Sequence, residues 1–318
     1  MMFGTRETFK YVHCTACGCL QIERIPKDLT PYYPPTYYSM RDADPGACAP
    51  IWFRLLIRLR VYMEVFKRKD WTLFRKEMEW RLPRAYDAIV AYLRHGGIEN
   101  FSARILDVGC GASAYRLRSC RQMGFRDLHG VDPYITADFD VDGIAVSKLD
   151  IEHVEGKYDF IMFHHSLEHI VDPVAALQAA ARNLGRNGVC LIRIPVMSSA
   201  LWQRYGSDWV ELDAPRHLHV MEKQTIDLMA RRAGMEVYHH QGDSEPWEFV
   251  ASEQCRANVP IHSANSWVND RRNDPHTNDE LAAFAREAVE MNAAGTSGRA
   301  CFYLRFASKP ASDRERNR

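Results

Sequence analysis

The sequence has no net charge, no long apolar run and no leader-like start. Lys and Arg together number 41, as do Asp and Glu, so the formal net charge is zero. A chain without excess positive charge has no overall attraction to nucleic acid. No uncharged apolar stretch reaches about 18 residues, the length of a membrane-spanning helix. The first residues, MMFGTRETFKYVHC, contain no apolar core of signal-peptide length. We therefore expect no nucleic-acid partner and no membrane span.

The cysteine content indicates a reducing compartment. Nine cysteines, an odd number, are scattered through 318 residues, which is typical of free thiols in a cytoplasmic protein. The composition is 46% hydrophobic and 26% charged, close to the globular average. The length allows one large domain or two modest ones with a sizeable core.

Local composition divides the chain into three parts. Residues 1–50 form a small head rich in Cys, Pro and Tyr, and the proline density of residues 26–50 excludes a helix or a central strand there. Residues 51–100 have a helical pattern that ends at a glycine pair. We interpret this stretch as a lid packed on the sheet and prefer this to a helix on a membrane surface, the alternative that its basic and aromatic residues allow. Residues 101–310 form the core, with a polar insertion at 241–299.

The core alternates short apolar runs with helical segments, a pattern typical of βαβ units and a parallel sheet. The predicted strands are 103–109, 128–132, 145–150, 158–163, 188–195, 235–240 and 300–308. The predicted helices are 114–123, 173–184 and 222–233. Within the insertion, only 278–294 is predicted to be helical.

A glycine turn follows the first core strand. Gly109 and Gly111 lie between the strand and the next helix, where exposed N–H groups can bind a ligand without obstruction by a Cβ. Asp132 ends the second strand, and a carboxylate there can accept both hydroxyls of a ribose. The spacing also satisfies the dinucleotide fingerprint of nicotinamide-dependent dehydrogenases. A tight turn without a ligand is the third interpretation.

Four motifs at successive strand ends give the sequence a family resemblance. The runs LDVGCG, VDP, LDI and FHHSLEHIVDP occur in this order, and together they resemble class I S-adenosylmethionine-dependent methyltransferases. The resemblance implies an α/β fold with a Rossmann-like, seven-stranded, mostly parallel sheet, helices on both faces and an N-terminal helical lid. It also implies S-adenosyl-L-methionine as the cofactor.

The resemblance implies that residues at these strand ends bind the cofactor: Asp107, Gly109, Gly111, Asp132, Asp150, Ile151 and His164. The two glycines would lie along the methionine end of the cofactor, and Asp107 would hold the glycine loop in place. Asp132 would bind the ribose, while Asp150 and the backbone of Ile151 would face the adenine. His164 and its neighbour His165 would lie beneath the sulfonium.

The head resembles, more loosely, that of bacterial methyltransferases with a zinc-ribbon-like N-terminus, which often accompany sugar or polysaccharide biosynthesis. Cys14 and Cys17 form one metal-binding knuckle, but a tetrahedral zinc site needs four ligands, and no second knuckle precedes them. We therefore predict no metal site. A Trp-containing loop from Trp202 to the run DAPRHLHVM extends the resemblance.

Methyl transfer to a hydroxyl needs a base. We predict His217 as this base and His165 as the next candidate. An Asn/Asp-Pro-Pro-aromatic turn, common in enzymes that methylate nucleic-acid amines, does not occur. The expected acceptor is a small hydroxylated molecule, such as a sugar, nucleotide-sugar or polysaccharide precursor. The alternatives are a quinone or phenol acceptor, a nicotinamide-dependent oxidoreductase, and a protein that binds a nucleoside without catalysis.

Overall fold

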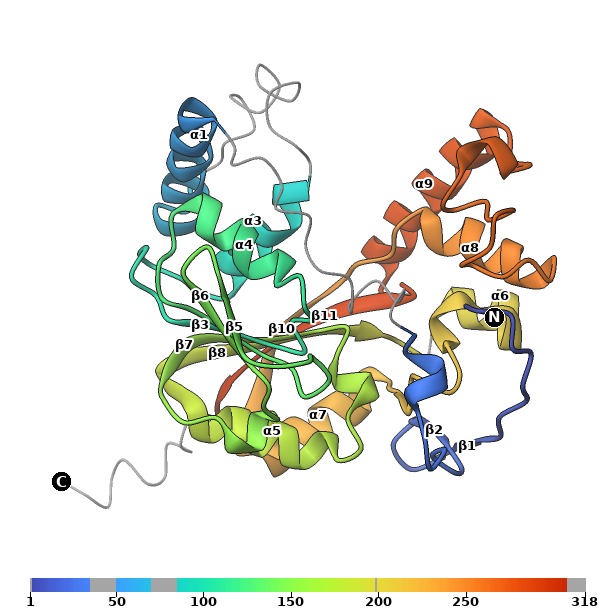
Figure 1. The fold of residues 1–318 in the computed structure, drawn as a ribbon, viewed down its shortest axis with the longest axis horizontal. Coiled ribbons are helices and arrows are strands. Elements are labelled where there is room, and N and C mark those ends of the chain that lie inside the picture. Colours follow the sequence, from blue (N-terminus) through green and yellow to red (C-terminus); the bar gives the residue numbers. More distant parts are fainter. Residues whose placement is uncertain (1, 35–49, 70–84, 198, 308–318) are drawn as a thin grey trace.

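The computed structural model describes residues 2–34, 50–69, 85–197 and 199–307. A twisted eight-stranded sheet crosses the molecule in the order β10-β11-β8-β7-β3-β4-β6-β5 (Figure 1). The strands β8, β7, β3, β4 and β6 are parallel to one another, and the others are antiparallel to their neighbours. Their bounds are β3 Ile105–Val108, β4 Leu128–Val131, β5 Phe139–Val141, β6 Ile144–Ser147, β7 Tyr158–His164, β8 Leu184–Pro195, β10 Met235–Gly242 and β11 Arg299–Phe306.

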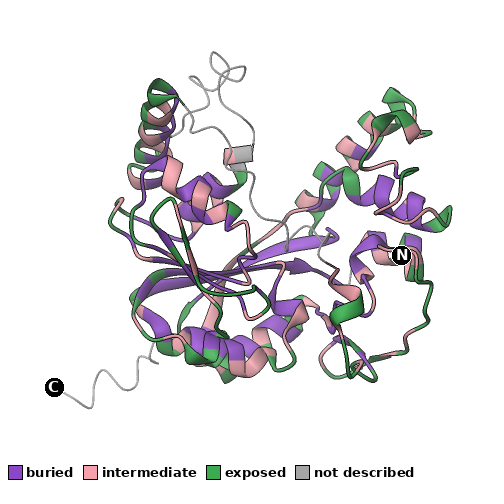
Figure 2. Ribbon diagram, in the orientation of Figure 1, coloured by how far each residue is buried: buried purple, intermediate pink, exposed green. Residues whose placement is uncertain are grey.

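The central strands are apolar on both faces because helices cover both. Along β3, Ile105 belongs to one core cluster and Leu106 to the other, as the alternation of side chains along a strand requires. Figure 2 shows this buried sheet between two half-exposed helical layers. The predicted mostly parallel sheet with helices on both faces is confirmed.

The helices divide between the two faces of the sheet (Figure 1). One face carries α1 Ile51–Val61, the π-helical turn η3 Tyr62–Phe66, α3 Ala85–His95 and α4 Tyr115–Met123. The other carries α5 Pro173–Asn183 and α7 Lys223–Arg232. Phe53, Ile57 and Val61 of α1 are buried in the same core as α4, which is the packing expected of the 51–100 segment. Within the segment predicted to be helical, residues 70–84 lie outside the described residues, as do residues 35–49 of the head.

The sheet has one strand more than the seven predicted. The additional strand is β5, which forms a hairpin with β6 through the two residues Asp142 and Gly143. Both adopt a positive φ, 57° and 74°, as the turn that matches the twist of a hairpin requires. An Asp-Gly pair is a strong hairpin signal, so the sequence contained the information for this strand.

The insertion contains more helix than the single segment predicted. It forms α8 Trp247–Arg256 as well as α9 Asn278–Ala294, and both pack near α6 Ala200–Tyr205. Phe249 of α8 and Phe284 of α9 stack with ring centroids 4.9 Å apart. The polar flanks of 247–256 obscured a segment that becomes helical because tertiary partners bury it.

The N-terminal head pairs with the core. Strands β1 Tyr11–His13 and β2 Leu20–Ile22 form a small antiparallel sheet with β9 His219–Val220. Short helical turns complete the fold: η1 Thr30–Tyr32, η4 Ile151–His153, η5 Leu167–His169, η6 Gly206–Asp208, η7 Val210–Leu212 and η8 Arg271–Asn273. None of the helices in the described ranges has the length and apolarity needed to span a bilayer.

Candidate functional site

A cavity of about 780 Å³ opens at the carboxyl ends of β3, β4 and β7. This is where open α/β sheets bind ligands, and the volume suits a nucleoside with a small second ligand. Its walls come from the turns after these strands and from the head. The lining includes Tyr33, Gly109, Asp132, Tyr134, Asp150, Ile151, His164, His165, Ser166 and His169.

The turn after β3 leaves no room for a side chain at Gly109. Its φ is +76°, and a Cβ there would lie 2.5 Å from the Cβ of Ser166. The Ser166 hydroxyl donates to the carbonyl oxygen of Val108 at 2.6 Å, so this contact fixes the β7 end against the β3 turn. Gly111 does not line the cavity; its N–H donates to Asp132 Oδ2 at 3.0 Å. At Gly109 the turn thus places backbone, without a side chain, against the cavity.

Asp132 lies at the end of β4 on the cavity wall. Its carboxylate accepts from the N–H groups of Gly111 and Tyr134, the latter at 2.8 Å. Burial raises the pKa of Asp132, and the two backbone hydrogen bonds oppose that rise. The resemblance implies that this carboxylate binds the ribose, and the two bonds hold it in one orientation beside the cavity.

Asp107 is buried behind the glycine turn. Its side chain is 1% exposed, and neither carboxylate oxygen has a hydrogen-bond partner. Burial raises its pKa to about 7, and the nearby Arg116 partly opposes this rise. An unsatisfied buried carboxylate is costly, and it is the kind of group that a cationic ligand such as an amine would satisfy. With the open glycine turn, it fits the methionine end of the expected cofactor.

The remaining residues predicted to contact the cofactor reach the same cavity. Asp150 precedes η4 and is exposed, while Ile151, the first residue of η4, is buried. His164 ends β7 with its ring across that of Tyr92, at a centroid distance of 5.6 Å. Burial holds the pKa of His164 well below its ordinary value, so its ring is neutral.

His165 lies at a strained position beside the cavity, with φ +52°. Arg193 donates from its guanidinium to His165 Nε2. Because a guanidinium only donates, Nε2 carries the lone pair and Nδ1 carries the proton. Nδ1 lies 3.3 Å from Glu168 Oε1 without hydrogen-bond geometry. Burial lowers the pKa of His165 well below its ordinary value, and Arg193 adds to the effect.

His217 lies behind the cavity wall, 5% exposed, and does not line the cavity. Its Nδ1 is 2.6 Å from the carbonyl oxygen of Glu211, so Nδ1 carries the proton and Nε2 the lone pair. Its ring lies across that of His169, 4.7 Å between centroids. His219 points elsewhere, towards the carbonyl oxygen of Val171 at 3.3 Å. The segment before them is a turn, so the two histidines do not share one face.

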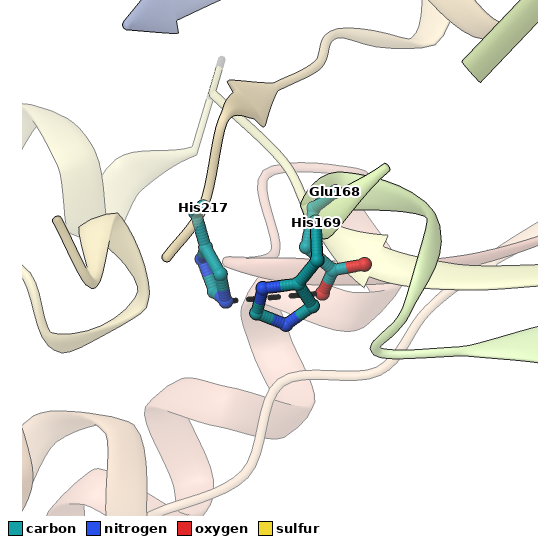
Figure 3. Close-up of side chains that lie close together, drawn as sticks. All are labelled: Glu168, His169 and His217. Carbon is teal, nitrogen blue, oxygen red and sulfur yellow. Dashed lines mark ion pairs between the residues drawn. The ribbon is translucent and has the colours of Figure 1, made fainter. Parts of the chain in front are cut away.

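Two contacts at the site join segments that lie far apart in the sequence. Tyr33, from the head, stacks on Tyr134 with centroids 5.7 Å apart and an interplanar angle of 10°. Glu168 and His169 approach His217 at the edge of the cavity (Figure 3). No local signal in the sequence connects Tyr33 with Tyr134, because the two residues are about 100 positions apart.

The head cysteines form a tight knuckle. The N–H of Gly18 donates to the carbonyl of Cys14, and the N–H of Cys14 donates to the carbonyl of Cys19, both at 2.8 Å. Burial raises the pKa of Cys19 to about 12, so this thiol stays protonated.

Comparisons with known proteins identify the family. A family described as "Methyltransferase domain" matches residues 73–240, more than half of the chain. The ubiquinone biosynthesis O-methyltransferase of Marinobacter nauticus is 28% identical over 155 residues, which cover 42% of this chain and 64% of that protein. The chain therefore spans less than two thirds of that relative's length.

Solved structures with a similar fold are more distant in sequence. An S-adenosylmethionine-dependent methyltransferase from Mesorhizobium loti is 17% identical, with a TM-score of 0.42, and the match covers 70% of this chain and 98% of that one. The magnesium protoporphyrin IX methyltransferase of Synechocystis, with bound S-adenosylhomocysteine, is 16% identical, with a TM-score of 0.38, and covers 51% and 77%. From the family match, the chain belongs to the methyltransferase-domain family and is a class I S-adenosylmethionine-dependent methyltransferase.

Proposed function

We propose that the enzyme methylates a hydroxyl group of a small acceptor that binds beside the cofactor in the β7-side half of the cavity. The cofactor half is formed by the turns after β3 and β4, which carry Gly109 and Asp132. The acceptor half lies between Tyr33, His165 and His169. The family assignment sets aside the nicotinamide-dependent and non-catalytic alternatives.

The observation that carries the proposal is a group of neutral histidines at one end of the cavity. Burial lowers the pKa of His165 well below the ordinary value and that of His169 to about 3. His217, behind them, also has a pKa lowered by burial. Neutral imidazoles can accept a proton or a hydrogen bond from a hydroxyl. An acceptor atom that is already a strong nucleophile would not need a histidine to accept its proton.

Two acceptor classes fit this arrangement. The first is a sugar or a sugar-containing precursor, supported by the resemblance of the head to methyltransferases of polysaccharide biosynthesis and by the stacked Tyr33 and Tyr134, whose faces suit a sugar ring. The second is a phenol or quinol, favoured by the likeness to the ubiquinone biosynthesis O-methyltransferase. Both classes present a hydroxyl to the histidines.

The cofactor supplies an electrophilic methyl group on a sulfonium, and the chain's own residues orient the acceptor and manage its proton. Asp132, oriented by the N–H of Gly111, and the glycine turn would hold the nucleoside of the cofactor. His217, the predicted base, keeps a lone pair on Nε2 but lies behind the cavity wall, so it would reach the acceptor only after a local rearrangement. His165 needs a local rearrangement to act as a base, because Arg193 already binds its lone pair. We therefore assign His165 first to orienting the acceptor.

The acceptor class is tested with methyl-labelled S-adenosylmethionine and two acceptor panels, one of nucleotide-linked sugars and one of catechols and quinols. Label in a sugar hydroxyl supports the first class, and label in a ring hydroxyl supports the second. His217→Gln and His165→Gln should each lower the turnover by at least about tenfold while binding S-adenosylhomocysteine within about twofold of wild type. Label found on nitrogen or carbon instead of a hydroxyl would contradict the proposal.

Placement of the ribose at Asp132 is tested by Asp132→Ala. Removal of a charged acceptor from a buried ligand should weaken binding of S-adenosylhomocysteine by about 1–3 kcal/mol, or roughly 5- to 150-fold. Asp140→Ala is the matched control, since Asp140 is exposed and caps only its own turn through Gly143. Calorimetric titration measures both, and equal affinities for the two variants would refute this placement.

A further inference from the structure

We infer that Glu168, His169 and His217 form a binding site for a divalent transition-metal ion such as Zn²⁺ at the acceptor end of the cavity. One ligand atom from each of the three residues lies within 4.8 Å of the other two, and in the described part of the chain no other His, Cys, Asp or Glu set meets this condition. Figure 3 shows the three side chains converging from η5 and from the turn before β9.

The carboxylate of Glu168 requires a partner that the protein does not supply. The residue is 1% exposed, and neither oxygen has a hydrogen bond. Other buried carboxylates near it pair with arginines, as Asp213 does with Arg216 and Glu211 with Arg299. Within the described residues, Glu168 has only two ion-pair contacts, both with histidines, at 3.3 and 4.0 Å. A buried group without a partner is costly and indicates a missing ion or water.

The two histidines are held as metal ligands usually are. Metal-binding histidines commonly donate their second ring nitrogen to a carbonyl, which fixes the tautomer and the orientation of the ring. His217 donates from Nδ1 to Glu211 O at 2.6 Å, which leaves the lone pair on Nε2, 4.0 Å from Glu168. Nδ1 of His169 lies 2.9 Å from Arg216 O. Each imidazole therefore keeps one nitrogen with a lone pair.

The ligand set selects the class of metal. Two imidazoles and one carboxylate are the ligands of catalytic zinc sites and of sites for related divalent ions, whereas Mg²⁺ and Ca²⁺ prefer oxygen ligands alone. Zinc bonds of about 2.1 Å place tetrahedral ligands about 3.4 Å apart, so the three atoms would need to converge by about 1 Å. Rotations of the three side chains can supply such a movement.

The site differs from the metal site that the head cysteines suggest and from the sequence expectation of no metal. Three protein ligands leave a coordination position for a further group. His169 lines the cavity, so a hydroxyl of the acceptor could take that position. This last step rests on the proposed function, but binding of the ion does not. With an ion bound, His217 acts as a ligand and not as a base.

The test measures metal content on the full chain without acceptor. Wild type, Glu168→Gln and His217→Ala are equilibrated with Zn²⁺, or with Mg²⁺ for comparison, and their bound metal is counted by mass spectrometry. His219→Ala is the matched control, because His219 lies two residues from His217 and contacts only a backbone carbonyl through its Nε2. Titration with S-adenosylhomocysteine shows which variants keep a folded cofactor site.

We expect about one Zn²⁺ per chain in wild type and His219→Ala, at least tenfold weaker binding in the other two variants, and no stoichiometric Mg²⁺. Co²⁺ bound at this site should give visible absorption without a thiolate charge-transfer band. Absence of bound Zn²⁺, or its retention in Glu168→Gln, would overturn the site, as would a thiolate band that Cys17→Ser removes. If His217 were only a base, His217→Ala would lose turnover and retain the metal. If wild type binds Zn²⁺ at this site but transfers no methyl group to a hydroxyl of either acceptor panel, the proposed function is refuted and the metal site is not.

Discussion

Gly109 and Asp107 show how single residues determine the shape of the cofactor side of the cavity. Gly109 is required both for its left-handed backbone and for the space that Ser166 occupies beside it. Asp107 contributes a buried carboxylate without a hydrogen-bond partner. Gly109 was identified from the local pattern, because a glycine turn between a strand and a helix has few structural solutions, whereas the role of Asp107 was implied only by the family resemblance. Their energies depend on neighbours distant in sequence.

Gly109→Ala should destabilise the fold by about 1–3 kcal/mol more than Gly295→Ala does. The two glycines have nearly the same φ, +76° and +73°, so the backbone penalty is shared. A Cβ at Gly295 meets nothing within 4 Å, whereas one at Gly109 would overlap Ser166. Urea unfolding of the two variants measures the difference. If both variants lose the same free energy of unfolding, Ser166 moves away from the new Cβ at no energetic cost.

Asp107 should make the stability of the ligand-free enzyme fall as the pH rises. Burial raises its pKa from 3.8 to about 7 in the folded chain. Between these values the folded state holds a proton that the unfolded state has lost, so the free energy of unfolding decreases with pH, by up to about 4 kcal/mol. Asp107→Asn removes this contribution. The unfolding free energy of wild type minus that of the variant should therefore decrease from about pH 4 to about pH 7 and level off above; a difference that increases with pH would contradict the assignment.

At the scale of elements, the cavity is assembled from strand ends and from the head. His164 and His165 come from the end of β7, and His169 comes from η5. Tyr33 directly follows η1 of the head. Tyr33 connects these parts, because its ring stacks on Tyr134 and its hydroxyl lies 3.1 Å from His169 Nδ1. The head therefore contributes a wall of the cavity.

Tyr33→Ala should weaken binding of S-adenosylhomocysteine by about 0.5–1.5 kcal/mol, because Tyr134, two residues after Asp132 on the cofactor side of the cavity, loses the ring that stacks on it. Tyr33→Phe keeps the ring and loses only the hydroxyl, so its affinity should remain within about twofold of wild type. Calorimetry distinguishes the two variants. If both weaken binding equally, the hydroxyl is the important group and the stack is not.

At the scale of the whole molecule, the head belongs to the same folded unit as the core. Strand β2 pairs with β9, and the hydroxyl of Tyr11 donates to the carbonyl of His217 at 2.7 Å. Cys19 joins the core cluster of the sheet, and Leu20 joins that of the insertion. We expect residues 2–34 to fold with the core, even though their composition separates them from it.

A chain that lacks residues 1–34 should be less stable than the full chain by about 5 kcal/mol, because three buried side chains of the head, Cys19, Leu20 and Ile22, lose their packing. Leu20→Ala tests the same contact with the chain intact, and we expect a loss of about 2–5 kcal/mol. Thermal and urea unfolding measure both. An unchanged transition in the shortened chain would show that the head is an independent appendage.

The sequence by itself determined the βαβ alternation, the glycine turn and the strand-end carboxylate Asp132, because these depend on side-chain periodicity and on backbone limits within a few residues. It also contained the Asp142-Gly143 hairpin signal that the prediction missed. Only the tertiary structure decided what lies around Glu168. The stack of Tyr33 on Tyr134 and the approach of His217 to Glu168 and His169 join segments far apart in the chain. Such contacts are set by the packing of whole elements, which local sequence does not encode.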